Sequence, residues 1–409
     1  MDEFVIDHLG KQGDGVVFVD GRATYVPFTL PGEHVVVSGK GPRKELDSIV
    51  KPSPARVEPS CRHFGSCGGC QVQHLGHSHY GEWKQELVRS ALAKAGLDER
   101  VEPLVSFSES TRRKCTFSVR KTNHGLSLGF VERFSDTIIP LDACPLLLPE
   151  IADRLPDIRK LCESLPTTKN SFRLTVLASE NGLDLGLEGT ARLKTTIKDV
   201  LARKALALGF ARFSCDGEIL IEKQKPVLKM GQCNVIPPPS AFVQAIETAE
   251  QTMTRLVCAH LYDCKNVADL FCGIGTFALR LAENSTVWAV EENDNALIAL
   301  DRAWRETGGR LKQVKTEGRN LDRRPVGFQE LKKIDGLVFD PPRAGAEKQA
   351  NQIAKSKVEK IAAVSCNPIT LARDLRILTD GGNEISQIIP IDQFRYTPHV
   401  EVVALLNKR

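Results

Sequence analysis

The chain has 409 residues, of which 42% are hydrophobic and 26% charged, and its formal net charge is +4. This length predicts two or three domains, and the composition is typical of a globular protein and excludes a fibrous or disordered one. The first ten residues contain acids and no apolar stretch, and no apolar run reaches the length of a membrane span. We therefore expect a cytoplasmic protein whose cysteines are thiols, metal ligands or catalysts rather than disulfides.

Short alternating apolar runs separated by turns occupy the first sixty residues. They cover residues 16–19, 23–26 and 34–37. This pattern predicts a small antiparallel β-barrel over residues 1–56. The segment Phe28–Glu33 resembles the middle of the TRAM module, an oligonucleotide-binding (OB) type of barrel that is attached to RNA-modifying enzymes. Residues 1–60 hold seven Lys or Arg against nine Asp or Glu, so any RNA contact here depends on a local patch.

A dense group of cysteines follows within Cys61–Cys70. Three thiols separated by glycines, which let the backbone fold back, predict a metal-ligand loop. Zinc could be completed by a nearby histidine, whereas an iron–sulfur cube would take its fourth thiolate from a distance. The histidines are His63, His74, His77 and His79, and the distant thiols are Cys115, Cys144 and Cys162. Cys144 is the favoured thiol because it lies in an irregular segment, where a side chain can turn inward.

The spacing of the cysteines carries a specific resemblance. Cys61-x5-Cys67-Gly-Gly-Cys70, followed by Gln73-His74, is similar to the cluster loop of the bacterial 23S ribosomal RNA (uracil-5-)-methyltransferases. In that family a 4Fe–4S cluster is held by three such cysteines and one distant Cys-Pro. The resemblance implies the ligand set Cys61, Cys67, Cys70 and Cys144. The related transfer-RNA uracil-5-methyltransferases lack the cluster, so its motif favours ribosomal RNA.

Residues 57–235 are expected to form a central α+β domain that carries this cysteine loop. An apolar stripe predicts a helix at 80–96, which can pack on the catalytic domain, and a strand pair is expected at 171–176 and 183–187. Five cations lie within residues 111–121. Such a run indicates either a solvated charged face or a contact with the RNA backbone.

From residue 236 onward, apolar runs alternate with helical segments, which predicts a Rossmann-like α/β domain with a mostly parallel sheet. The strands are expected at 267–271, 287–290, 337–339 and 361–365. Gly273 and Gly275 follow the first strand in a G-x-G-x-x-A pattern, and Glu291 ends the second, where a carboxylate would accept both ribose hydroxyls. Both NAD and S-adenosylmethionine meet these requirements. Asp340-Pro341-Pro342-Arg343 favours a methyltransferase, and Arg343, in place of a stacking aromatic residue, argues against an exocyclic amine target.

Cys366 and Glu401 lie at two neighbouring predicted strand ends. Asn367 and Pro368 suit the N-cap and first position of a helix, so the Cys366 sulfur would face the helix's positive end, where the pKa of a thiol falls. Such a pair fits methylation at uracil C5. A thiolate that adds to C6 makes C5 nucleophilic, and a base then removes the C5 proton so that the thiol can leave.

The segments Ser365–Asp374 and His399–Glu401 are similar to the same uracil-5-methyltransferase family. The resemblance implies that Cys366 is the nucleophile, that Glu401 is the proton acceptor and that S-adenosylmethionine is the methyl donor. The cofactor contacts would be Gln244, Phe271, Gly273, Gly275, Thr276, Glu291, Asn320 and Asp340. Two positions depart from the family pattern, because Ile246 and Thr276 each stand where many relatives have Asn.

The sequence therefore predicts an enzyme that methylates uridine C5 in 23S ribosomal RNA. The target base must leave its stack, and an unpaired loop uridine costs least to extrude. We expect RNA as the partner, with no membrane association and no obligate protein partner evident. The alternatives are a transfer-RNA uracil-5-methyltransferase, a non-catalytic RNA-binding protein and an NAD-dependent oxidoreductase.

Overall fold

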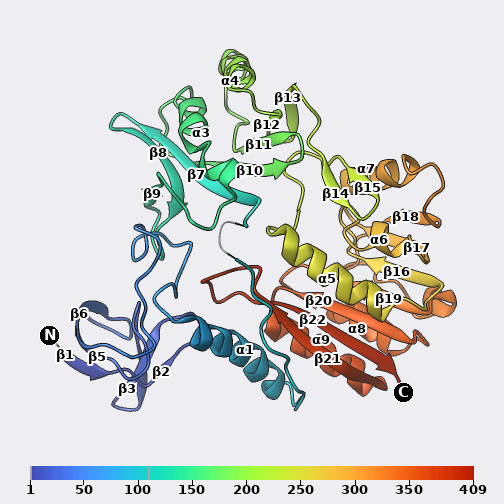
Figure 1. The fold of residues 1–409 in the computed structure, drawn as a ribbon, viewed down its shortest axis with the longest axis horizontal. Coiled ribbons are helices and arrows are strands. Elements are labelled where there is room, and N and C mark those ends of the chain that lie inside the picture. The colour runs from blue at the N-terminus through green and yellow to red at the C-terminus, as the bar shows by residue number, and fades with distance from the viewer. Residues whose placement is uncertain (1, 109–110) are drawn as a thin grey trace.

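The structure is a computed structural model that describes residues 2–108 and 111–409. The chain forms an N-terminal β unit, a central α+β unit and a C-terminal α/β unit, which follow one another from blue through green to red in Figure 1. Within the described residues, every helix is too short or too polar to span a membrane.

The N-terminal unit consists of two antiparallel sheets, ordered β1-β5-β6 and β2-β3-β4. The strands are β1 (Asp2–Val5), β2 (His8–Leu9), β3 (Gly15–Val19), β4 (Arg22–Val26), β5 (His34–Ser38) and β6 (Glu45–Lys51). Alternate residues of these strands point inward, so Ile6, Val26, Val35 and Val37 form a small buried core. These strands lie within residues 1–56, for which the sequence predicts a small antiparallel barrel.

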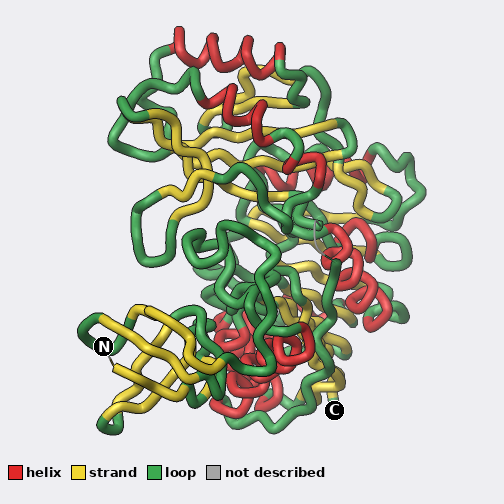
Figure 2. The backbone as a smooth tube through the Cα atoms, turned by 60° about the vertical axis from the view of Figure 1, so that its left-hand side comes forward, coloured by secondary structure: helices red, strands yellow, loops and turns green. Residues whose placement is uncertain are grey.

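The cysteine loop leads from this unit into the long helix α1 (His77–Lys94). Val88, Ala91 and Leu92 lie on one face of α1 and join the core beside helix α9 (Pro368–Asp380) of the C-terminal unit. Segment 97–108 then runs along the sheet edge, where Val105 donates its backbone N–H to Pro390. Figure 2 shows that the region between the N-terminal strands and the central sheet consists mostly of loops.

The central unit is a sheet ordered β13-β12-β11-β10-β7-β8-β9 with three helices packed against it. Its strands are β7 (Lys114–Thr122), β8 (Gly125–Val131), β9 (Ile138–Pro140), β10 (Phe172–Ser179), β11 (Gly182–Glu188), β12 (Arg212–Cys215) and β13 (Glu218–Glu222). The helices are α2 (Pro149–Ala152), α3 (Leu155–Cys162) and α4 (Thr195–Ala207). The strand pair predicted near 171–187 is β10 and β11, paired antiparallel.

The catalytic unit is a sheet ordered β18-β17-β16-β19-β20-β22-β21 with helices on both faces. Its strands are β16 (Asn266–Leu270), β17 (Thr286–Glu291), β18 (Val314–Gly318), β19 (Gly336–Phe339), β20 (Lys360–Ser365), β21 (Asn383–Ile391) and β22 (Glu401–Lys408). The helices are α5 (Glu247–His260), α6 (Ala278–Leu281), α7 (Asp294–Arg305), the 3₁₀ helix η1 (Glu330–Lys333), α8 (Glu347–Ala354) and α9 (Pro368–Asp380). Strands β16 to β20 are parallel, whereas β22 runs antiparallel to both neighbours.

The sequence-based division at residue 235 does not match the packing of the chain. The hairpin β14 (Leu228–Met230) and β15 (Cys233–Val235) was assigned to the central domain. Its buried side chains Leu228, Met230 and Val235 pack in the core of the catalytic unit instead. Such a short apolar hairpin cannot bury its own surface and therefore joins the larger neighbouring core.

Candidate active site

Segments far apart in the sequence meet at one edge of the catalytic sheet. Parallel strands place their carboxyl ends at the same edge, which puts Phe271, Glu291 and Asp340 at the ends of β16, β17 and β19. Strand β22 is antiparallel and begins there. Ser365 of β20 pairs with Val402 of β22. Cys366, which follows Ser365, and Glu401, which precedes Val402, therefore come together at the same edge.

The glycine loop after β16 leaves room for a ligand. Gly273 has φ of 53°, its N–H donates to Glu291 Oε2 at 3.1 Å, and no atom lies within 4 Å of where a Cβ would stand. Gly275, at φ of 97°, has a packing role, because a Cβ there would meet Leu300 at 2.9 Å. Phe271 also adopts φ of 63°, which is uncommon for a bulky residue and occurs mainly at functional sites.

The loops after β17 and β18 complete the far side of this crevice. Glu291 Oε1 accepts the backbone N–H groups of Glu292 and Asn293 at 2.8 and 2.9 Å, which fixes the carboxylate at the strand end. Asn320 donates to the Glu292 carboxylate at 2.7 Å, so it lies in the same region. Thr276 is held through its carbonyl, which accepts from Arg280 at 2.7 Å.

A chain of amide side chains connects the buried carboxyl group of Glu401 with that of Asp340. Gln244 donates to Asp340 at 3.2 Å, and Gln393 donates both to Gln244 Oε1 at 2.7 Å and to Glu401 at 3.0 Å. All but Asp340 are at most 4% exposed. Sequence reasoning missed Gln393, although a polar pair directly after the apolar strand β21 was an available signal.

The carboxyl groups of the crevice share an electrostatic environment that favours a cation. Burial raises the pKa of Asp340 to about 7. Burial, and then the charge of Asp340, raise the pKa of Glu401 well above its usual range. The pKa of Asp269 is raised in the same way, first by burial and then by Asp340 and Glu291. A bound positive charge would stabilise these carboxylates and lower their pKa values. S-adenosylmethionine carries a positively charged sulfonium, so the residues fit this cofactor.

The Cys366 thiol occupies the predicted place but not the predicted electrostatic state. Asn367 caps α9, because its side chain accepts the Ile369 N–H at 3.1 Å. The expected fall in pKa is wrong for the unliganded protein. Burial, followed by the charge of Glu401, raises the pKa of Cys366 to about 11, and the nearby Arg343 guanidinium offsets only part of this effect. Desolvation here outweighs the helix dipole.

Arg343 and His399 are site residues to which sequence reasoning assigned no contact. The Arg343 carbonyl accepts from Asn367 Nδ2 at 3.0 Å and from Thr370 Oγ1 at 3.2 Å, so the start of α9 fixes the segment that carries it. Burial, followed by the charge of Arg343, lowers the pKa of His399 to about 4, which leaves its ring neutral near pH 7. Both residues separate the Cys366 cavity from a second, larger cavity.

The cavity in front of Cys366 has a volume of about 220 Å³ and is lined by the N-terminal unit, helix α1 and the catalytic unit. Its catalytic-unit lining includes Arg343, Cys366 and His399. Lys11 and Gln12 come from the N-terminal unit, and the third contribution is Leu87 of α1. The N-terminal unit therefore forms part of the wall that faces the Cys366 thiol.

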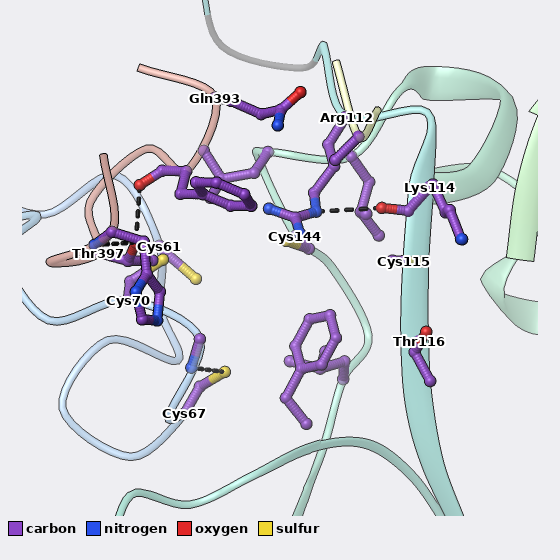
Figure 3. A pocket seen from close by; sticks show the side chains of 18 of the residues that line it. Cys61, Cys67, Cys70, Arg112, Lys114, Cys115, Thr116, Cys144, Gln393 and Thr397 are labelled. Carbon is purple, nitrogen blue, oxygen red and sulfur yellow. Dashed lines mark hydrogen bonds between the residues drawn. The ribbon is translucent and has the colours of Figure 1, made fainter. Parts of the chain in front are cut away.

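The larger cavity, about 440 Å³, brings the predicted cluster cysteines together. Figure 3 shows Cys61, Cys67 and Cys70 on one loop and Cys144 on another segment across the cavity. Cys115 also lines it, from strand β7. Burial, with smaller contributions from the neighbouring thiols, raises the pKa of Cys70 to about 12. Such thiols remain protonated near pH 7 unless a cationic group stabilises their thiolates.

Two loops are tied together beside this cavity. Asp142 accepts from His63 Nε2 at 2.7 Å and pairs with Arg62 at 3.1 Å, which holds the Cys144 segment against the cysteine loop. Neither His63 nor His74 is among the described residues that line the cavity, and His74 packs between aromatic rings. Within the described residues, no group of three His, Cys, Asp or Glu side chains is arranged to hold a single metal ion.

The cationic run at 111–121 has largely an internal role. Arg113 is 3% exposed, pairs with Glu250 and donates to the Gln244 carbonyl at 3.1 Å. Lys114 donates to the carbonyl of Ala241. Arg113 and Lys114 therefore join the central unit to the catalytic unit, and the buried Arg113 is not available to an RNA backbone.

The departure at Ile246 is explained by packing. Ile246 is 5% exposed and joins the hydrophobic core beside α5. Its side chain provides no polar contact, whereas Gln244, two residues earlier, provides the amide that reaches Asp340.

Comparison with known proteins places this arrangement in a family. The family model described as tRNA (uracil-5-)-methyltransferase matches residues 237–409. An RNA methyltransferase of Brucella suis is 48% identical over 406 residues, covering 99% of this chain and 98% of that protein. The 23S rRNA (uracil(1939)-C(5))-methyltransferase RlmD of Halomonas elongata is 32% identical over 436 residues, covering 99% of this chain and 89% of that one. The chain belongs to the RNA (uracil-5-)-methyltransferase family.

Members of this family are S-adenosylmethionine-dependent enzymes, which agrees with the cation-favouring crevice. A further relative, from Caulobacter vibrioides, is named an RNA methyltransferase and is 40% identical over 416 residues, covering the whole of both chains. The fold is that of a Pyrococcus abyssi tRNA (uracil-54, C5)-methyltransferase solved with S-adenosyl-L-homocysteine. The TM-score is 0.77 at 23% identity, covering 99% of this chain and all of that one.

Proposed function

We propose that this enzyme methylates C5 of a uridine in 23S ribosomal RNA through a covalent bond between Cys366 and uracil C6. The observation that carries the proposal is the meeting of Cys366, Glu401 and Arg343 at one sheet edge, beside a crevice suited to a sulfonium. An RNA methyltransferase that acted on an amine or hydroxyl would need no thiol opposite a buried carboxyl group.

The proposed chemistry assigns one task to each of the two groups. Cys366, as the thiolate, adds to C6, and the electron pair moves to the C4 carbonyl as an enolate whose C5 becomes nucleophilic. S-adenosylmethionine supplies the methyl group when it is bound. Glu401, as the carboxylate, then accepts the C5 proton, the C5–C6 double bond forms again and Cys366 leaves as the thiolate.

The protein supplies the ionisation that these steps require. Arg343 is placed to stabilise the Cys366 thiolate, and it already offsets part of the rise in the pKa of that thiol. Gln393 donates to Glu401 Oε2 at 3.0 Å, which orients the carboxyl group and favours its charged form. A cation bound beside Asp340 would lower the pKa of Glu401 further, so cofactor binding prepares the base.

We also propose that Cys61, Cys67, Cys70 and Cys144 hold a 4Fe–4S cluster. The four thiols surround a cavity instead of converging on a single point, which suits a group larger than one ion. The ionic irons would stabilise thiolates that burial otherwise disfavours. Zinc fits less well, because the nearby His63 is paired with Asp142 and does not line the cavity.

The choice of 23S ribosomal RNA over transfer RNA rests on two observations. The RlmD relative, whose name specifies 23S rRNA, is similar over 99% of this chain. The cysteine loop also resembles that of the 23S ribosomal RNA enzymes of the family. The description of the family model at 237–409 names tRNA, which makes transfer RNA the competing substrate.

A substrate comparison tests the proposal directly. Anaerobically purified protein is incubated with labelled S-adenosylmethionine and either a 23S rRNA transcript or a transfer-RNA transcript, and nucleosides are then analysed. The proposal predicts 5-methyluridine in the 23S transcript only. If 5-methyluridine formed in transfer RNA alone, transfer RNA and not 23S rRNA would be the substrate. Label in another nucleoside would contradict methylation at C5.

A further inference from the structure

An exposed aromatic side chain stands near the Cys366 cavity and has no part in the chemistry above. Phe134 lies in the turn between β8 and β9 and is 73% exposed. Its φ of 61° places a bulky residue in the left-handed region, which costs free energy and persists where the surrounding structure imposes it. Nothing in the core of the central unit requires this ring to face outward.

Two arginines support the Phe134 ring. The guanidinium carbons of Arg43 and Arg133 lie 4.4 and 4.8 Å from the ring centroid, although one comes from the N-terminal unit and the other from the central unit. Both arginines pair with Asp14, which is 1% exposed, and the Arg43 contact is 2.8 Å. One buried carboxylate therefore holds both guanidiniums beside the ring, and the ring, 73% exposed, still presents surface to a ligand.

The turn that carries Phe134 is also held by the cysteine loop. The Gly68 N–H donates to the Val131 carbonyl at 3.1 Å, and Cys67 pairs with Glu132 in a β-bridge. A Cβ at position 68 would lie 2.4 Å from that carbonyl oxygen, so the close approach requires glycine. The cysteine loop therefore positions the β8–β9 turn and, through it, the exposed ring.

A cationic path joins this ring to the Cys366 cavity. Arg133 donates to the Gln12 carbonyl at 3.0 Å. Gln12 and its neighbour Lys11 both line the cavity. Lys11 lies within hydrogen-bonding reach of Lys94, and this second ammonium lowers the pKa of Lys11. Two adjacent ammonium groups favour a bound anion such as a phosphate.

We propose that Phe134, supported by Arg43 and Arg133, is a stacking site for an unpaired base of the RNA strand that also presents the target uridine to Cys366. Arginines beside an aromatic ring are the combination that holds single-stranded nucleic acid, because the ring stacks on a base while the cations attract the backbone. The proposal deepens the proposed function, since it assumes an RNA substrate, but it does not depend on which RNA is methylated.

Binding and catalysis are measured separately to test this site. The probe is a single-stranded RNA oligonucleotide carrying 2-aminopurine, whose fluorescence is quenched on stacking, and the protein is the full-length holoenzyme. Replacement Phe134→Ala should weaken binding about tenfold and reduce the quenching, whereas Phe134→Trp should retain both. Tyr262→Ala is the matched control, because Tyr262 is 70% exposed and lies outside both cavities.

Steady-state methylation separates a binding role from a loss of fold. For Phe134→Ala the KM for RNA should rise about tenfold while kcat at saturating RNA stays at the wild-type value. Unchanged RNA affinity in Phe134→Ala would overturn the proposal. A defect seen only with assembled ribosomal subunits, and not with naked RNA, would also overturn it and would assign the ring to a protein contact. Absence of methylation by the wild type would refute the proposed substrate, while the oligonucleotide measurement would still decide the stacking site.

Discussion

The two thiol-bearing cavities of this protein lie on either side of Arg343 and His399 but differ in the surroundings of their sulfurs. Cys366 stands among charged and ionisable groups, with Glu401, Asp340 and Arg343 all affecting its pKa. In the larger cavity, the pKa of Cys70 is raised chiefly by burial, with smaller contributions from neighbouring thiols. The first environment can stabilise and release a single thiolate during a reaction. In the second, Arg112 offsets only part of the effect of burial on the pKa of Cys144, so a group of thiolates there would need a bound cationic group.

The difference extends to how each cavity is built. Cys366 and Glu401 are positioned by the ladder between β20 and β22, which is part of the sheet itself. The cysteines proposed to hold a cluster lie on loops that are held by contacts such as His63 with Asp142. We therefore expect substitutions at the sheet edge to change the chemistry with little effect on the fold, and substitutions at the loop cysteines to act through local structure.

The largest effect is expected from replacing Cys366, the proposed nucleophile. Cys366→Ala should lower turnover by at least about 10⁴-fold, because no other group can form the bond to C6. Cys258→Ala is the control, since Cys258 is a partly buried thiol on α5 that lines neither cavity. The measurement is 5-methyluridine formation at saturating RNA. Turnover by Cys366→Ala within tenfold of the wild type would remove this residue from the mechanism.

Replacement of Glu401, the proposed base, should stop the reaction after methyl transfer. Glu401→Gln preserves shape and an acceptor for Gln393 but cannot take the C5 proton, so turnover should fall about 10³-fold and a covalent protein–RNA adduct should accumulate. Denaturing gel electrophoresis detects the adduct as a slowly migrating band. A Glu401→Gln enzyme that turns over normally, or that is inactive without forming an adduct, would contradict the assigned role.

The raised pKa of Cys366 predicts the direction of the pH dependence. With a pKa of about 11 in the free enzyme, the thiolate fraction increases about tenfold per pH unit below that value. The value of kcat/KM, which reports on the free enzyme, should therefore rise about 100-fold between pH 7 and pH 9. A plateau that begins below pH 8 would show that Cys366 ionises more easily than its burial allows.

A smaller effect on turnover is expected at the cysteine cavity. Cys70→Ser should remove bound iron and the brown chromophore, and should lower turnover about tenfold through the displaced loop. Cys115→Ala is the matched control, because Cys115 lines the same cavity but is not among the proposed ligands. Iron and acid-labile sulfide analysis of anaerobic samples makes the comparison. Retention of iron in Cys70→Ser, or loss of it in Cys115→Ala, would contradict the proposed ligand set.

Local sequence patterns predicted part of the site, whereas features that depend on tertiary contacts could not be predicted from sequence. The N-cap at Asn367 and the strand ends at Glu291 and Asp340 follow from local patterns, because hydrophobic periodicity and capping act over a few residues. The raised pKa of Cys366 could not be predicted, since it depends on burial and on Glu401, which is distant in sequence. The cationic run likewise lacked any sign that Arg113 would be buried against Glu250.

Residues that act through tertiary contacts were also beyond local patterns. In the sequence, Lys84 looks like an ordinary helical cation, yet it is fully buried. It donates to the Phe394 carbonyl at 3.1 Å and to the carbonyl of His399, two residues before Glu401. Its partner Asp392, 3.2 Å away, is 308 positions later in the chain. Only the folded chain reveals such a contact, which holds the loop that leads into β22.

The most direct test of the account is to trap the bond between enzyme and RNA. A 23S rRNA transcript containing 5-fluorouridine offers a C5 fluorine that Glu401 cannot remove as a proton, so the reaction should stop as a covalent adduct once the methyl group has been transferred. Digestion and mass spectrometry should identify a single modified peptide in which Cys366 carries a methylated fluorouridine nucleotide. An adduct on any other residue, or none under conditions that methylate ordinary transcript, would contradict covalent catalysis by Cys366.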